Sequence, residues 1–89
     1  MNRTIWKYHV PVSGSFELMM PLGAKILDVQ VQHGIPVMWA AVDPMGLQYP
    51  KAFRIIGTGH PLEDLTGDYI GTFQLEDGNL AFHLFSIEK

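Results

Sequence analysis

Hydrophobic and polar residues alternate along nearly the whole chain, which is the pattern of half-buried β-strands. The first example is TIWKYHV at positions 4–10, where Thr4, Trp6, Tyr8 and Val10 share one face. Proline and a Ser-Gly-Ser run at 13–15 interrupt the alternation after this segment and predict a turn. Further strands are expected over FELMM (16–20) and AFRII (52–56), and a loop is expected over VDPMGLQYPK (42–51).

Two longer segments predict β-hairpins, because a turn dipeptide separates two alternating runs in each. In the first hairpin His33-Gly34 forms the turn, and the expected cross-strand pairs are Val31 with Pro36, Val29 with Met38, and Leu27 with Ala40. In the second hairpin Asp77-Gly78 forms the turn, and the expected pairs are Leu75 with Leu80, Phe73 with Phe82, and Gly71 with Leu84. Each hairpin therefore has one wholly apolar face.

These elements predict an all-β fold, or a β-rich α+β fold. We expect a single domain over residues 1–89 with six or seven antiparallel strands and at most one short helix, as a small barrel or a two-layer sandwich.

The second faces of the hairpins are less polar than a solvated sheet face should be. In the first hairpin Val37 and Trp39 lie on this face, and in the second hairpin Phe85 and Ile87 do. In the second hairpin, this face is expected to pair Gln74, Thr72 and Ile70 of the first strand with Ala81, His83, Phe85 and Ile87 of the second strand. A chain of 89 residues has little left to build another layer, so we expect Val37, Trp39, Phe85 and Ile87 to form a homo-oligomer interface.

Composition and charge limit the classes of partner that the protein is expected to bind. The net charge is −3, and the six Lys and Arg residues are scattered, so duplex nucleic acid and anionic membranes are not expected partners. The chain contains no cysteine, which excludes disulfides and thiolate metal sites. It shows neither a signal peptide nor a membrane-spanning run, so a cytoplasmic protein is expected.

The segment RIIGTGHPLED at 54–64 is the main candidate for chemistry. A glycine turn leading to Pro61 at the start of a helix can bind an anion, although the acidic residues that follow would repel it. His60 and Glu63 lie one helical turn apart, but two ligands do not fix a metal. Alternatively, the segment is only a strand that exits through glycines into one helical turn with acidic residues at its positive end.

The residue inventory does not favour an enzyme. None of the three serines has a nucleophile-elbow context, and the histidines show no metal-ligand spacing. We therefore expect no catalytic residue, no metal and no cofactor. Candidate ligand-binding residues are Arg54 as the cation for an anionic ligand, Gly57, Thr58, Gly59 and His60 in the glycine turn, and Trp39 as the stacking ring.

Four motifs occur in order: TIWKY, VQVQ-G-P--WA-VDP, GTGHP and YIGTFQ. With them the chain resembles a family of short, uncharacterised proteins of tailed phages and prophages. The resemblance covers almost the whole sequence and implies the cytoplasm of an infected host cell. It brings no established catalytic residues, and it implies that GTGHP and YIGTFQ mark either a fold constraint or a shared site.

Two hypotheses follow. In the first, the protein is a non-enzymatic, oligomeric, phage-encoded binding protein that acts in counter-defence, by sequestering a nucleotide-like signal or by masking a host protein. In the second, it is a structural or assembly protein that packs through an exposed apolar sheet face.

Overall fold

The structure of the chain is a computed structural model that describes residues 2–62 and 67–87. These residues form seven strands and no helix, and so no helix that could cross a membrane. The strands are β1 (Thr4–His9), β2 (Ser15–Pro21), β3 (Lys25–Gln32), β4 (Ile35–Val42), β5 (Gln48–Gly57), β6 (Gly67–Leu75) and β7 (Leu80–Ile87). The short helix allowed for after Pro61 falls partly on residues 63–66, outside the described residues.

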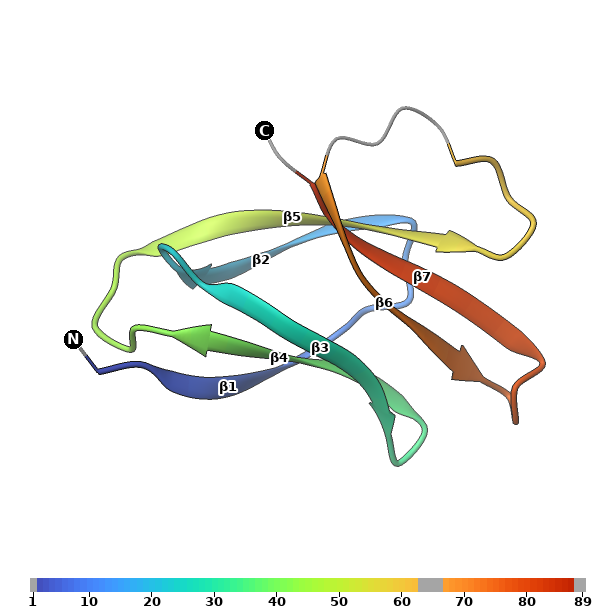
Figure 1. The fold of residues 1–89 in the computed structure, drawn as a ribbon, viewed down its shortest axis with the longest axis horizontal. Coiled ribbons are helices and arrows are strands. Elements are labelled where there is room, and N and C mark those ends of the chain that lie inside the picture. Colours follow the sequence, from blue (N-terminus) through green and yellow to red (C-terminus); the bar gives the residue numbers. More distant parts are fainter. Residues whose placement is uncertain (1, 63–66, 88–89) are drawn as a thin grey trace.

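The strands make two antiparallel sheets that face each other as a sandwich (Figure 1). One sheet has three strands in the order β1-β4-β3, and the other has four in the order β2-β5-β7-β6. The two predicted hairpins thus fall in different sheets: β3 and β4 in the first, β6 and β7 in the second. The prediction of an all-β fold is confirmed, and the two sheets correspond to the sandwich alternative.

The core lies between the inner faces of the two sheets. It is a cluster to which both sheets contribute, made of Val10, Met20, Val29, Met38, Phe53, Ile55, Phe73 and Leu84. Phe16 and Phe53 stack across β2 and β5 with ring centroids 5.2 Å apart. This burial of large apolar side chains is the main favourable contribution to folding.

The first hairpin confirms two of its three predicted pairs. Val31 lies opposite Pro36 and Val29 opposite Met38, with positive φ angles of 53° at His33 and 78° at Gly34. The third pair is wrong, because a β-bulge between Ile26 and Asp28 adds one residue to β3. Ile26 takes the position opposite Ala40, and Leu27 is left 45% exposed.

The second hairpin confirms all three predicted pairs. The turn is longer than Asp77-Gly78 alone, since Glu76 also has a positive φ of 56°. Beyond the third pair the register shifts between Tyr69 and Gly71, so Ile70 is an extra residue in β6. As a result Tyr69, not Ile70, lies opposite Phe85.

The strand predicted over 52–56 begins earlier than expected, at Gln48. The proline at position 50 suggested a loop, because proline cannot donate a ladder hydrogen bond. In the structure Pro50 lies opposite Met19 of β2, while pairing with β7 starts only at Ala52. One side of β5 is therefore unpaired at Pro50, which is where a strand tolerates proline.

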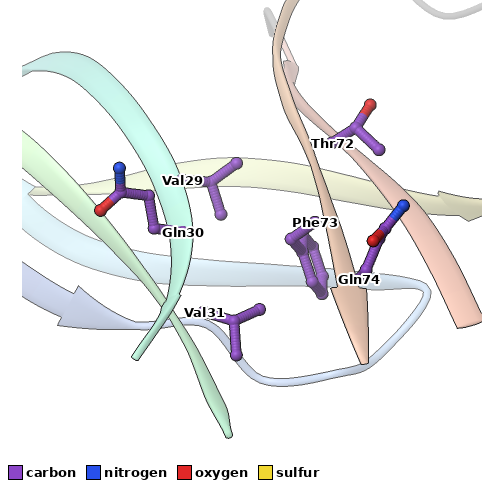
Figure 2. A pocket seen from close by; sticks show the side chains of 6 residues that line it. All are labelled: Val29, Gln30, Val31, Thr72, Phe73 and Gln74. Carbon is purple, nitrogen blue, oxygen red and sulfur yellow. The ribbon is translucent and has the colours of Figure 1, made fainter. Parts of the chain in front are cut away.

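The strands β3 and β6 lie side by side at the open edges of the two sheets. Gly71 makes this approach possible, since a Cβ there would lie 2.8 Å from Val29 Cγ1. Beside this contact the two strands border a groove of about 480 Å³. Figure 2 shows Val29 and Phe73 pointing into the space between the strands, whereas Gln30 and Thr72 point away from it.

We predict that Leu84→Ala lowers the free energy of unfolding by about 3 kcal/mol, the usual cost of a cavity at a buried leucine. Leu84 is completely buried in the core. Leu80→Ala is the matched control, because the same change on the same strand removes a side chain that is 45% exposed, and it should cost less than about 1 kcal/mol. Urea denaturation measures both values, and equal losses would contradict the described core.

Candidate functional site

The outer face of the four-stranded sheet presents two rows of side chains that run across β5, β7 and β6. Alternation places them there, because Phe53, Ile55 and Leu84 point into the core and their neighbours point outward. Strand pairing defines the first row as Arg54, Phe85 and Tyr69, and the second row as Ile56, His83 and Thr72.

The Gly57–His60 segment is a tight turn that folds back beside these rows. The His60 backbone N–H donates to the Gly57 carbonyl oxygen at 3.1 Å, and Gly59 has a φ of 89°. A glycine at the third position with positive φ is the requirement of a type II turn. The Thr58 backbone N–H donates to the Ala81 carbonyl oxygen at 3.1 Å, which ties the turn to β7.

The two glycines of the turn have different roles. At Gly59 a Cβ would meet nothing within 4 Å, so the positive φ alone favours glycine there. At Gly57 a Cβ would lie 3.3 Å from Cδ2 of the His60 ring, because that ring packs directly on the glycine.

The turn and the outer face together enclose a cleft of about 300 Å³. It is lined by Ile56, Gly57, Thr58, Gly59, His60, Leu62, Tyr69, His83 and Phe85. Leu62 is 66% exposed and Tyr69 is 58% exposed, and the Tyr69 ring contacts Phe85 edge-on with centroids 5.5 Å apart. Apolar and aromatic walls with few polar groups are typical of small-molecule sites.

A chain of hydrogen bonds crosses the floor of the cleft. His83 Nε2 is 2.7 Å from Thr58 Oγ1, and His83 Nδ1 is 2.8 Å from Thr72 Oγ1. Thr72 Oγ1 is in turn 2.5 Å from the Tyr69 hydroxyl. Thr58 Oγ1 also donates to the Ala81 carbonyl oxygen, at 3.3 Å. Both ring nitrogens of His83 are thus held by threonine hydroxyls, which fixes the orientation of the ring.

The β-bulge at Ile70 is what brings Tyr69 into this chain. Residues three apart in a regular strand point to opposite faces, because side chains alternate. The extra residue cancels one alternation, so Tyr69 and Thr72 share the outer face while Ile70 packs against the core.

The structure brings together most of the predicted ligand-binding residues. Gly57, Thr58, Gly59 and His60 all line the cleft. Arg54 does not line it but stands in the adjoining row, directly opposite Phe85. Trp39 is not part of the site: it lies on β4 between Met38 and Ala40, which are both buried, and therefore on the outer face of the other sheet.

The predicted interface residues likewise separate onto two faces. Val37 and Trp39 lie outside the three-stranded sheet, and Phe85 and Ile87 outside the four-stranded sheet. The expectation that Val37 stands exposed is wrong, since it is only 1% exposed within the single chain.

Polar side chains of the neighbouring strands cover the outer face around Trp39. Lys7 of β1 reaches across β4, so that its Nζ lies 6.0 Å from the Trp39 ring centroid and donates to Gln32 Oε1 of β3 at 2.8 Å. Long polar side chains shield apolar surface in this way with their aliphatic stems. Lys7 and Gln32 thus cover part of this face, on which Ile5 is still 61% exposed and Ile35 is 50% exposed.

The sequence candidates for ligand binding do not include His83 and Thr72 of the hydrogen-bond chain, or the apolar residues Ile56 and Leu62 of the cleft. The predicted hairpin register already placed Thr72 opposite His83, and the structure confirms that pair. The part played by Tyr69 depends on the bulge, for which the sequence carries no clear signal. Within the described residues no group of three or more His, Asp or Glu side chains is placed to hold a metal.

A family model described as a domain of unknown function, DUF7352, matches residues 1–89. No curated protein and no solved structure matches the chain.

We predict that Gly59→Ala destabilises the protein by about 1 kcal/mol, because alanine resists a φ of 89°. Gly57→Ala should cost less, since only the flexible His60 ring has to move away. Thermal unfolding measures the stabilities, and the ¹³C shifts of the His60 ring report its displacement in Gly57→Ala only. A more costly Gly57→Ala would contradict the described turn.

Proposed function

We propose that this protein, which belongs to the DUF7352 family, is a non-enzymatic binding protein that holds a small ring-bearing anion in the cleft of the four-stranded sheet. The observation that carries the proposal is the Gly57–His60 turn, which is folded over His83 and encloses a cleft against Tyr69 and Phe85.

The walls of the cleft favour a flat ring. Phe85 and Tyr69 offer aromatic surface on one side, and Leu62 and Ile56 add apolar surface. Aromatic side chains stack on nucleobases without demanding a particular base. The volume of about 300 Å³ is at the lower end of small-molecule sites, which suits a single base rather than a polymer.

The position of Arg54 favours an anionic group on the ligand. Arg54 lies opposite Phe85 in the row next to the cleft, so its positive charge can attract a phosphate attached to a ring that is bound against Phe85. Glu17 of β2 stands opposite Ala52 and shares this outer face. Removing the charge of Arg54 should therefore lower the affinity for an anion, and removing the charge of Glu17 should raise it.

The floor of the cleft favours binding over turnover. A general base needs a ring nitrogen free to take a proton from its substrate. Both nitrogens of His83 lie within hydrogen-bond distance of threonine hydroxyls, so the ring serves as a structural part of the floor.

The resemblance to tailed-phage proteins supplies the cellular setting of the proposal. In the cytoplasm of an infected host, a small protein that binds a nucleotide-like signal lowers its free concentration by mass action. We therefore propose counter-defence by sequestration, with no cofactor and no duplex nucleic acid as partner.

A second candidate function is assembly with copies of itself, and it rests on a different surface from the predicted one. Met45 is 91% exposed, Leu47 is 75% exposed, and Leu22 is 58% exposed. The Leu22 backbone N–H donates to the Leu47 carbonyl oxygen at 2.7 Å, so the β2–β3 and β4–β5 loops present these side chains together. The Met45 backbone N–H donates to Asp43 Oδ1 at 3.0 Å. Neighbouring exposed apolar side chains of this kind favour association.

We predict that the protein binds adenosine 5′-monophosphate and that Arg54→Ala weakens the binding about fivefold, as expected for an exposed charge pair. Glu17→Gln should strengthen it, because a negative charge leaves the face. Lys7→Ala is the matched control, since it removes a cation from the opposite outer face. Isothermal titration at low salt measures the affinities. Absence of nucleotide binding by the folded wild-type protein would overturn the binding proposal.

We predict for the second candidate that the double variant Met45→Ser, Leu47→Ser shifts the protein from oligomer to monomer, since it removes the apolar surface that copies would share. Native mass spectrometry counts the subunits. Trp39→Ala should leave the count unchanged, because it lies on a different face from these loops and Lys7 already lies over its ring. A wild-type monomer, or an oligomer that persists in the double variant, would exclude assembly through these loops.

A further inference from the structure

The hydrogen-bond chain on the cleft floor has a direction, which follows from counting donors and acceptors. It ends at the Ala81 carbonyl oxygen, which can only accept. Thr58 Oγ1 donates its single proton there, so it can only accept from His83 Nε2. Nε2 therefore carries the ring proton, and a neutral imidazole with a protonated Nε2 has an acceptor at Nδ1.

The direction continues through β6 to the mouth of the cleft. Because Nδ1 accepts, the Thr72 hydroxyl donates to it, and Thr72 Oγ1 then accepts from the Tyr69 hydroxyl. With a neutral imidazole, this is the one arrangement of protons in which all four hydrogen bonds of the chain are made together. The reverse arrangement leaves Thr58 without a proton for Ala81.

The consequence is a polarised hydroxyl at the mouth of the cleft. Tyr69 turns its only proton inward to Thr72, so its oxygen offers lone pairs alone toward the cleft. Tyr69 is also 58% exposed and lines the cleft, so a bound ligand can reach this oxygen.

We propose that Tyr69 determines ligand specificity by accepting a hydrogen bond from a ring amine, so that the cleft selects amino-substituted ring anions such as adenine nucleotides. Thr72 is the positioning residue, because it orients the Tyr69 hydroxyl and is itself oriented by His83. This inference rests on the proposed binding function and names the ligand class of the same cleft. A ligand that lacks the amine leaves the Tyr69 oxygen facing a group that cannot donate to it.

The binding test compares adenosine 5′-monophosphate with purine riboside 5′-monophosphate, which lacks only the exocyclic amine. Isothermal titration should show the adenine nucleotide bound about three- to tenfold more tightly by the wild-type protein, the usual value of one hydrogen bond. Tyr69→Phe should reduce this ratio to about one. Thr72→Val should reduce it as well, because valine cannot accept the Tyr69 proton, whereas Thr72→Ser keeps a hydroxyl and should keep the preference.

The ligand-free test is the tautomer of His83 at about pH 8. Two-bond ¹H–¹⁵N NMR spectra of the ring should show the proton on Nε2 in the wild-type protein and in Thr72→Ser. A proton on Nδ1 would reverse the chain and overturn the inference.

The outcomes separate the two proposals. If neither nucleotide binds to the folded protein, the binding function itself fails. If both bind with equal affinity, or if the preference for the amine survives in Tyr69→Phe, the binding function stands and the assignment of Tyr69 is wrong.

Discussion

The β-bulge at Ile70 is the constraint on which the rest of the site depends. One extra residue in β6 changes which side chains of the strand face outward. With it Ile70 packs against the core, and Tyr69 lies opposite Phe85 on the outer face. A regular strand would turn Tyr69 inward, and the chain of hydrogen bonds through His83 would stop at Thr72. The bulge lies next to Gly71, where β6 comes closest to Val29 of the other sheet, so the packing of the two sheets and the composition of the cleft are set at the same point.

The uncovered outer faces of the two sheets differ in how their apolar side chains are shielded from water. Each sheet has one face on the shared core and one face that no further layer of the described residues covers. On the three-stranded sheet the aliphatic part of Lys7 and its hydrogen bond to Gln32 cover Trp39. On the four-stranded sheet the Gly57–His60 turn folds beside His83 and leaves a cleft. The first arrangement shields part of the apolar surface, whereas the second leaves a cleft of about 300 Å³.

The sequence predicts the hairpins well because their determinants are local. Turn residues that adopt positive φ, such as Gly34 and Gly78, fix the register, and alternation then assigns the faces. The prediction fails at the two β-bulges, at Leu27 and at Ile70, because the sequence carries no signal for the extra residue. A single extra residue exchanges the two faces of a strand. It also fails to separate Trp39 from the glycine turn, because alternation does not say that the two hairpins belong to different sheets. The sequence therefore predicts two parts of the candidate site, the glycine turn and the pairing of Thr72 with His83. It does not predict that Tyr69 lies on the same face as Thr72.

The polar part of the cleft floor is made of hydroxyls, a carbonyl and an imidazole, and this has a consequence for recognition. Hydroxyl groups can rotate, so one threonine alone would present either a donor or an acceptor to a ligand. Linked in series to the Ala81 carbonyl, the same groups lose that freedom, because each proton position fixes the next. The backbone carbonyl of Ala81 on β7 thereby determines whether the Tyr69 hydroxyl on β6 donates or accepts. The connection runs through the side chain of His83, since β7 and β6 are neighbouring strands. The positive charge that the proposed function uses belongs to Arg54, which lies in the adjoining row of side chains. In the function that we propose, selection among rings and attraction of an anion are carried by different residues, which is why substitutions can separate the two.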